Sequence, residues 1–217
     1  MIERVTLDKV ILIADRGYEN YNIMSHAIEK GWKFLIRIKD VHSNGIASGL
    51  ELPQTAVFDM DINLILTRNQ TKSKKQAGYK FMPTVQTFDY LPIGSKEDYP
   101  ISFRIARFKI ADDSYETVIT NLDRFCFSAE KLKELRWGIE TSFRELKYAI
   151  GLTSFHAKKV DYIKQEIFAR LTLYNYCELI TTYVVEHTEN ISKKNQVNFT
   201  IAIYICREYL RRKRKLR

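Results

Sequence analysis

The sequence lacks the features of secreted, disulfide-stabilised and membrane-spanning proteins. Its 217 residues include only 3 cysteines, and none of them forms a Cys-x-x-Cys pair. We therefore expect reduced thiols in the core of a cytoplasmic protein: Cys126, Cys177 and Cys206. The N-terminus is charged from Glu3 onward, so no signal peptide is expected, and no apolar run is long enough to cross a membrane. The 4 histidines show no metal-ligand spacing.

Positive charge and aromatic residues are both plentiful. The hydrophobic fraction of 45%, with 12 Phe and 13 Tyr, is enough for a sizeable core. A net charge of +9 favours an anionic partner. Part of this charge lies in a basic C-terminal tail, made up of Arg211, Arg212, Lys213, Arg214, Lys215 and Arg217. Such a tail is typical of an electrostatic arm that contacts nucleic acid or an acidic membrane surface without reading sequence.

The first forty residues predict a strand, a helix and a second strand. The apolar run from Lys9 ends in a carboxylate, Asp15, as expected of a buried parallel strand. Asn20 or Asn22 is a candidate cap for a helix that runs to about Lys30, and residues 32–38 form the next strand. Asp15 then lies at the carboxyl end of a strand, where α/β folds place their chemistry. Taken alone, Asp15 is better explained as a turn or cap residue after a strand.

Residues 41–113 have a different character and predict a β-rich insertion. All 4 prolines lie here, and the β-like runs are 56–67, 85–90 and 101–110. We expect a small antiparallel sheet. The lysines of the polar loop 71–76 are candidate DNA contacts, but a solvated loop explains them better.

The rest of the chain returns to the main sheet and then becomes helical. Residues 116–122 predict another strand, and Ser128 is a candidate cap for the helix that follows. A long helix is expected over 160–186, and a last helix from about Phe199. The expected domains are a βαβ half-sheet (1–40), the insertion (41–113), the completion of the catalytic domain (114–188), and the C-terminal helix with its basic tail (189–217).

The helix at 136–147 places charges and aromatic residues at helical spacing. Arg136, Glu140, Phe143 and Lys147 follow spacings of four, three and four, which predicts one shared face. A carboxylate between two cations suits a metal ligand beside phosphate-binding groups. An ordinary solvated helix with charge pairs is the alternative. For Trp137 and Phe143, core packing or cleft lining is favoured over base stacking.

Two of these segments resemble a known family. Asp15-Arg16-Gly17-Tyr18, at the end of its apolar strand, is similar to the second catalytic aspartate and its turn in DDE transposases of the insertion-sequence type. Arg136, Glu140 and Lys147 match the third catalytic residue within the Tyr-Arg-Glu-Lys signature of these enzymes. The resemblance implies an α/β fold, a ribonuclease-H-like mixed sheet with flanking helices, interrupted by a β-rich insertion.

The resemblance also implies a reaction and its residues. The family cleaves phosphodiester bonds at the ends of an insertion sequence and then transfers the strand to target DNA, using two Mg²⁺ (or Mn²⁺) ions held by carboxylates. Asp15 and Glu140 would be catalytic metal ligands. Arg136 and Lys147 would bind DNA phosphates, and Lys133 would add a contact. The implied partners are transposon-end and target DNA and a second copy of the chain in a synaptic complex.

Two departures from the family pattern matter. The position of the signature tyrosine is occupied by Lys133, which binds phosphate but cannot stack on a base. The first catalytic aspartate and its strand are not recognisable before Asp15, so the fold is expected to be incomplete at its N-terminus. We therefore expect this chain to be inactive alone, with an exposed strand edge at 9–15 and the N-terminal half supplied by a separate polypeptide or a longer reading frame.

Two other functions stay open at the level of sequence. A non-catalytic DNA-binding remnant that regulates transposition would keep the basic surface and the phosphate-binding residues. A basic nuclease or RNA-binding domain unrelated to transposition would leave the Arg-x3-Glu-x6-Lys spacing as a coincidence. The DNA upstream of the codon for Met1 distinguishes the first two, because only a catalyst needs an upstream strand with an aspartate.

Overall fold

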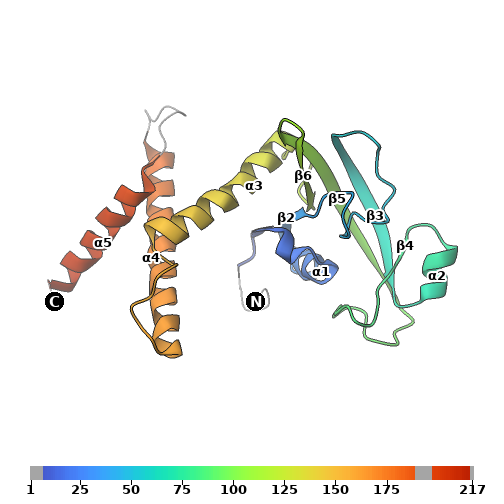
Figure 1. Cartoon of the computed structure of the whole chain (residues 1–217), viewed down its shortest axis with the longest axis horizontal. Coiled ribbons are helices and arrows are strands. Elements are labelled where there is room, and N and C mark those ends of the chain that lie inside the picture. The colour runs from blue at the N-terminus through green and yellow to red at the C-terminus, as the bar shows by residue number, and fades with distance from the viewer. Residues whose placement is uncertain (1–6, 189–196, 216–217) are drawn as a thin grey trace. The chain divides into compact units, whose positions relative to one another are not determined.

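The computed structural model describes residues 7–188 and 197–215. The chain divides into two compact units, Met1–Ile139 and Glu140–Arg217. We call the first the sheet unit and the second the helical unit, and the boundary between them falls within helix α3 (Figure 1).

The sheet unit is built on one six-stranded mixed sheet with the strand order β1-β2-β6-β5-β3-β4. The strands are β1 (Ile11–Ala14), β2 (Lys33–Ile38), β3 (Phe58–Thr67), β4 (Tyr79–Phe81), β5 (Asp98–Ala111) and β6 (Ser114–Thr120). The predicted βαβ unit is confirmed, because β1 and β2 pair in parallel and are connected by α1 (Tyr21–Glu29). The Asn20 side chain accepts from the amide of Asn22 and caps α1, as predicted.

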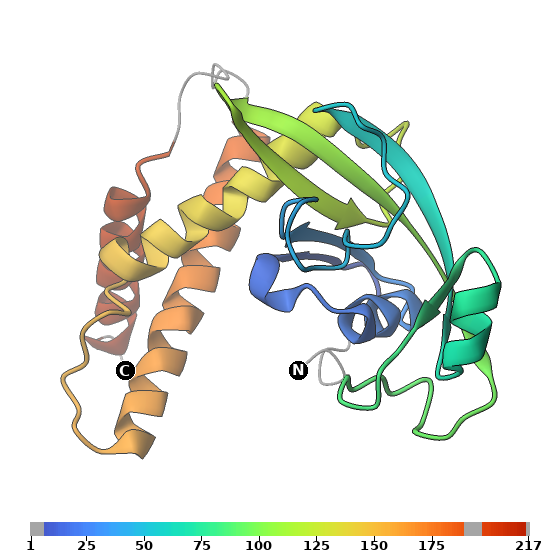
Figure 2. The same ribbon diagram turned by 45° about the vertical axis from the view of Figure 1, so that its right-hand side comes forward.

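The insertion continues the main sheet. The prediction of a separate small antiparallel sheet was therefore wrong. β5 pairs antiparallel with both β3 and β6, and β6 pairs antiparallel with β2. Figure 2 shows β3 and β5 side by side over most of their length. The reason is the length of β5: its 14 residues are long enough to pair with β3 at one end and β6 at the other.

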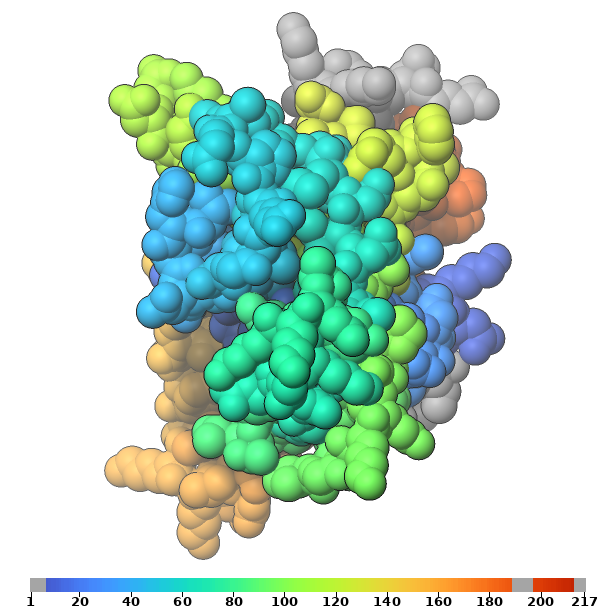
Figure 3. Space-filling model, turned by 90° about the vertical axis from the view of Figure 1, so that its right-hand side faces the viewer, coloured from blue at the N-terminus to red at the C-terminus, as the bar shows by residue number. Residues whose placement is uncertain are grey.

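Two local predictions in the insertion were also wrong. Residues 85–90 form turns, because the Arg68 guanidinium binds the carbonyl oxygens of Met82, Pro83, Gln86 and Leu91 and leaves them unavailable to a strand. Residues 70–75 form helix α2 (Gln70–Lys75), since the Asn69 side chain accepts from two amides of its first turn. α2 lies at the surface, in the centre of the face seen in Figure 3.

Both faces of the sheet are covered. On one face, α1 and the loops of the insertion enclose a core that includes Met24, Phe34, Ile36, Leu66 and Ile105, all fully buried. On the other face, α3 (Ala129–Arg144) contributes Leu132 to a smaller core with Leu35, Ala106 and Val118. Ser128 accepts from the Lys131 amide, in agreement with its predicted role as the cap of α3.

The helical unit consists of the end of α3, a π-helical turn and two further helices, with a small core among them. α3 passes into a π-helical turn, η3 (Glu145–Ala149), and is followed by α4 (Val160–His187) and α5 (Phe199–Lys215). The two helices predicted after Gly151 are therefore confirmed. Ile150, Tyr174, Cys177, Ile203 and Cys206 are the buried residues of this core. Cys177 and Cys206 are core thiols as predicted, but Cys126 is exposed, because it lies in the loop before α3.

The C-terminal basic tail is only partly described. Its backbone continues α5 as far as Lys215, and Arg217 lies outside the described residues. Most of the predicted loop 189–197 also lies outside them. Among the described residues, no helix is long and apolar enough to cross a membrane.

Candidate functional site

Asp15 is placed where the sequence predicted, immediately after β1 at its carboxyl end. The chain turns there through a short 3-10 helix, η2 (Arg16–Tyr18), and the Tyr18 amide donates to the Asp15 carbonyl oxygen at 2.9 Å. The Oδ1 atom of Asp15 is shielded from solvent and makes no hydrogen bond to the described residues. The nearest cation to it is Arg37, whose Nη1 lies 3.5 Å away.

Arg37 on β2 lies between two carboxylates. One is that of Asp15, which follows β1, and the other is a buried carboxylate on β6, the strand on the other side of β2. The Nε atom of Arg37 lies 2.6 Å from Oε1 of Glu116, which belongs to β6 and is 5% exposed. Ile13 pairs with Leu35 in the parallel register of β1 and β2, so Asp15 follows on the same face as Arg37. The neighbouring strands β1, β2 and β6 thus place three charged groups on one face of the sheet. They are the carboxylate of Asp15, the guanidinium of Arg37 and the carboxylate of Glu116.

Arg136 reaches the same buried carboxylate from α3. Its Nη2 lies 2.8 Å from Oε1 of Glu116, and its side chain is 3% exposed. The sequence predicted one face shared by four residues, but Arg136 is buried, whereas Glu140, Phe143 and Lys147 are exposed. Arg136 follows Leu132 by one helical turn, and both point toward the sheet.

Glu140, Phe143 and Lys147 belong to the helical unit and are exposed. Lys147 lies on the π-helical turn η3, where the hydrogen bonds run from residue i+5 to residue i, as from the Ile150 amide to the Glu145 carbonyl. The wider turn breaks the four-residue spacing predicted between Phe143 and Lys147. Trp137 and Phe143 are 58% and 50% exposed, so neither packs in a core, and cleft lining, the other expected role, stays a prediction.

The sequence suggested a DNA phosphate as the partner of Lys133, and the structure shows a contact with the backbone of β5. The ammonium group of Lys133 donates to the carbonyl oxygen of Lys109 on β5, at 3.0 Å, and its side chain is half-buried. This contact attaches the second turn of α3 to the sheet. A role in DNA binding for Lys133 stays a prediction.

Glu145, the first residue of η3, has a perturbed carboxyl group. Burial and the neighbouring charge of Glu178 raise the pKa of this group. Tyr174 donates to its Oε2 at 3.4 Å. Folding thus disfavours the ionised form of Glu145 relative to the unfolded chain, whereas a metal ligand must be ionised.

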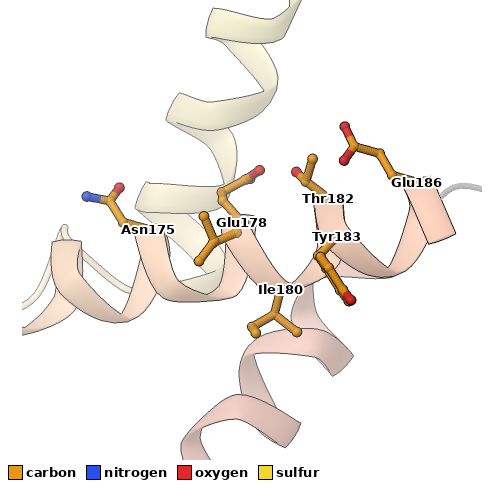
Figure 4. Close-up of a pocket in the computed structure, with 7 residues that line it drawn as sticks. Asn175, Glu178, Ile180, Thr182, Tyr183 and Glu186 are labelled. Carbon is orange, nitrogen blue, oxygen red and sulfur yellow. The ribbon is translucent and has the colours of Figure 1, made fainter. Parts of the chain in front are cut away.

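A shallow groove runs along the C-terminal half of α4, away from the signature residues. Glu178, Thr182 and Glu186 point to one side of the helix, and Ile180 and Tyr183 point to the other (Figure 4). None of the residues predicted to bind metal or DNA lines it.

Comparison with known protein families shows to which family the chain belongs. A family model described as a transposase DDE domain matches residues 1–176, which include both signature segments. The chain belongs to the DDE transposase family. No curated protein sequence matches the chain.

Membership of the DDE transposase family settles the fold and the general chemistry. The six-stranded mixed sheet with flanking helices is consistent with the ribonuclease-H-like fold that the sequence predicted. DDE transposases are phosphoryl-transfer enzymes that bind DNA and typically use divalent metal ions. The enzyme class predicted from the sequence is confirmed at this level.

Asp15 fits the metal chemistry of a DDE transposase. A carboxylate oxygen that is shielded from solvent and makes no hydrogen bond is available to a hard divalent cation. Within residues 7–188 and 197–215, no three His, Cys, Asp or Glu side chains form a group that could hold a metal ion. Asp15 and Glu140 are thus candidate ligands that belong to different units.

Sequence reasoning missed Arg37 and Glu116, the two residues that link Asp15 to Arg136. The signal was present in the strand alternation, because Arg37 follows Leu35 on one face of β2 and Glu116 precedes Val118 on one face of β6. Buried charges on central strands are rare unless they are paired. A search for such charges next to Asp15 would have found both.

Proposed function

We propose that this DDE transposase domain cleaves DNA at the ends of an insertion sequence and joins them to target DNA, with Asp15 and Glu140 as metal ligands. The proposal is supported most directly by the position of Asp15, after a parallel strand and with one shielded oxygen that makes no hydrogen bond. The family match over both signature segments supports the assignment of Glu140. Two copies of the chain would act on the two ends.

The side chains have separable tasks in this reaction. Asp15 and Glu140 would hold the metal ions through their carboxylate oxygens, the ligands that Mg²⁺ prefers. Metal ions held there would supply activation of the attacking hydroxyl and stabilisation of charge on the leaving oxygen. Lys147 is exposed and binds a DNA phosphate as a point charge. The guanidinium of Arg37 lies beside Asp15.

We also propose that a further strand, carrying the third carboxylate, pairs with the outer edge of β1. β1 is the end strand of the sheet and pairs only with β2 among the described residues. Ile11 at its start is 41% exposed, and an apolar edge of this kind is a template for strand addition. The 217 residues alone are accordingly expected to be inactive.

The test is cleavage of supercoiled DNA that carries the sequences flanking the coding region. We expect no Mg²⁺-dependent nicking by the chain alone, and nicking when a polypeptide encoded upstream, with an apolar strand and an aspartate, is added. Glu140→Gln keeps the size of the side chain and removes the charge, so it should abolish nicking in the mixture.

Two results would contradict the proposal in different ways. Nicking by the chain alone, abolished by Glu140→Gln, would show that no third carboxylate from another strand is needed. DNA binding without nicking under every condition, with an upstream region that encodes no strand, would favour the non-catalytic regulator. Nicking that survives Glu140→Gln would remove Glu140 from the site.

A further inference from the structure

The turn that follows Asp15 is exposed, although hydrogen bonds hold its backbone. None of the three residues of η2, Arg16, Gly17 and Tyr18, is buried. The Tyr18 amide donates to the Asp15 carbonyl oxygen at 2.9 Å. The next amide, that of Glu19, donates to the Arg16 carbonyl oxygen at 3.3 Å. The turn therefore presents its side chains to solvent from a hydrogen-bonded backbone at the carboxyl end of β1.

The carboxylate of Glu19 fastens this turn to the loop that follows β2. Its Oε2 atom accepts from the Lys39 amide at 2.9 Å, and its Oε1 atom accepts from the Ile46 amide. A Cβ atom at Gly45 would overlap Oε1 of Glu19. A larger residue at position 45 would therefore push the carboxylate away from the two amides, so the fold itself explains this glycine.

The fold of the described residues does not require a glycine at Gly17. Its φ lies outside the left-handed region, where glycine is favoured. A Cβ atom at this position would meet no heavy atom within 4 Å beyond its chain neighbours, so alanine would fit the turn. Glycine also serves where a ligand must approach the backbone closely, and the open space beside Gly17 suits that use.

Arg16 carries an exposed positive charge. Its guanidinium forms no ion pair and no hydrogen bond with the described residues. Two other cations, at the end of β2, are engaged. Arg37 binds Glu116, and the ammonium group of Lys39 donates to a carbonyl oxygen, that of Asn44, at 3.1 Å. The Arg16 guanidinium differs from both in being available to an anionic ligand.

We propose that the turn formed by η2 binds the backbone of DNA. The Arg16 guanidinium holds a phosphate group through paired hydrogen bonds, and Gly17 lets the strand approach the peptide backbone. Glu19 is the positioning residue that keeps the turn in this orientation. Because Arg16 follows Asp15 directly, the bound strand lies beside the proposed metal ligand. The inference rests on the proposed function, which supplies DNA as the anionic ligand.

The first test removes the charge of Arg16 and, as a matched control, that of Lys9. Lys9 is exposed and precedes β1, whereas Arg16 follows it, so Arg16→Gln and Lys9→Gln each remove one positive charge from one end of the same strand. The affinity of the 217-residue chain for a random-sequence DNA duplex is measured against salt. Arg16→Gln should reduce the slope of log affinity against log salt by about 1, as for one lost phosphate contact, and Lys9→Gln should leave it unchanged. Equal slopes in the two variants would overturn the contact.

The second test compares two glycines. Gly17→Ala should leave the melting temperature unchanged or raise it slightly, and weaken binding to the same duplex by about threefold or more. Gly45→Ala should lower the melting temperature by about 5 °C, because it displaces the Glu19 carboxylate from its amides. A lower melting temperature in Gly17→Ala, or unchanged DNA binding, would overturn the close approach.

The third test concerns the positioning role of Glu19. Glu19→Gln removes a negative charge, and this change alone would strengthen binding to DNA. The variant should instead weaken binding by about threefold or more, because the amide nitrogen of glutamine cannot accept from one of the two backbone amides. Arg16→Gln should then cost less affinity in the Glu19→Gln background than in the wild type. Stronger or unchanged binding by Glu19→Gln would overturn the positioning role.

Failure of this inference differs from failure of the proposed function. If the wild type binds the duplex and Arg16→Gln behaves as Lys9→Gln does, the contact at Arg16 is wrong and the proposed function stands. If the wild type does not bind the duplex even at low salt, DNA is not its ligand, and the proposed function and the contact at Arg16 are both wrong.

Discussion

The sheet unit and the helical unit differ in how completely they bury their apolar side chains. Both faces of the sheet are covered, and Phe34, Leu35 and Ile36 on β2 are fully buried. In the helical unit, apolar side chains stay exposed along α4 and α5, among them Phe168, Leu179, Tyr183, Tyr204 and Ile205. The sheet unit is therefore stabilised by its own core, whereas the helical unit is stabilised by a small core and leaves much of its apolar surface in water.

The difference extends to the residues that we propose for catalysis and DNA binding. Asp15 lies in the well-packed unit, with Arg37 and Glu116 around it. Glu140 and Lys147 are exposed side chains of the less well-packed unit. Substitutions in the two units can test this difference in packing.

The largest expected effect is a loss of stability on replacing a buried phenylalanine, compared with replacing an exposed one. Phe34→Ala empties a fully buried position in β2 and should lower the free energy of unfolding by about 3–5 kcal/mol. Phe168→Ala removes a side chain that is 68% exposed on α4 and should change it by less than about 0.5 kcal/mol. Urea denaturation followed by circular dichroism measures both, and equal losses would contradict the comparison.

The second prediction concerns an ion pair inside the sheet unit. Arg104 on β5 is 3% exposed and donates to Asp59 on β3 from Nε at 2.6 Å. Burial raises the pKa of Asp59, but the hydrogen bonds and charges of Arg104 and Arg124 outweigh it and lower the pKa below its usual value of 3.8. The pair thus contributes stability that is present above pH 3.8 and is lost as the pH falls through the lowered pKa.

Asp59→Asn should consequently lower the free energy of unfolding at pH 7 by about 1–3 kcal/mol and weaken the loss of stability in acid. Asp61→Asn is the matched control on the same strand. Asp61 is 67% exposed and forms an ion pair with Arg124 at 3.1 Å, so its loss should cost less than about 1 kcal/mol. Urea titrations at pH 7 and pH 3 measure both variants, and equal losses would contradict the contrast in burial.

Much of the sheet unit could be predicted from local patterns in the sequence. The apolar run before Asp15, one of the two candidate caps of the helix and the strand at 33–38 were identified from such patterns. β2 is a buried strand, as its continuous apolar run indicates, whereas β1 is an end strand that is exposed at Ile11. The joining of the insertion to the main sheet could not be predicted. Strand pairing between β5 and both neighbours depends on register over long sequence separations, which no local pattern contains.

The site was predictable only in part, and for a similar reason. The choice of Asp15 and Glu140 as metal ligands came from their surroundings in the sequence and the family resemblance, and it stays a prediction. The burial of Arg136 could not be predicted, because the partner that buries it is Glu116 on a distant strand. The π-helical turn at Lys147 was also missed, since i+5 hydrogen bonding has no sequence pattern comparable to a cap.

The third prediction sharpens the contrast in exposed apolar surface. Leu179→Lys replaces a side chain that is 68% exposed in the groove of α4, and Ile93→Lys replaces an isolated one, 71% exposed, in the sheet unit. Clustered apolar surface binds dyes and promotes association, whereas single exposed residues do not. The fluorescence of bound anilinonaphthalene sulfonate should fall by about a third or more with Leu179→Lys and stay unchanged with Ile93→Lys. Equal responses would mean that α4 presents no continuous apolar surface.

The smallest expected effect concerns two glutamates near the ends of α3. Their substitution should change the free energy of unfolding in opposite directions. Burial and the charge of Glu178 raise the pKa of Glu145 in the helical unit. Folding therefore favours its protonated form, and the stability this contributes is lost as the pH rises above the usual value of 4.5. Hydrogen bonds from its own amide and from Ser128 lower the pKa of Glu130 in the sheet unit, so its contribution is lost as the pH falls.

Glu145→Gln should therefore raise the free energy of unfolding at pH 7 by about 0.5 kcal/mol, whereas Glu130→Gln should lower it slightly. The two substitutions are chemically identical and lie on the same continuous run of helix, so their difference isolates the environment. Melting curves at pH 5 and pH 8 measure both, and the gain from Glu145→Gln should be larger at pH 8. A loss of stability at pH 8 would mean that the ionised carboxylate of Glu145 is favoured in the folded chain. Folding would then lower the pKa of Glu145, as it lowers that of Asp59 in the sheet unit.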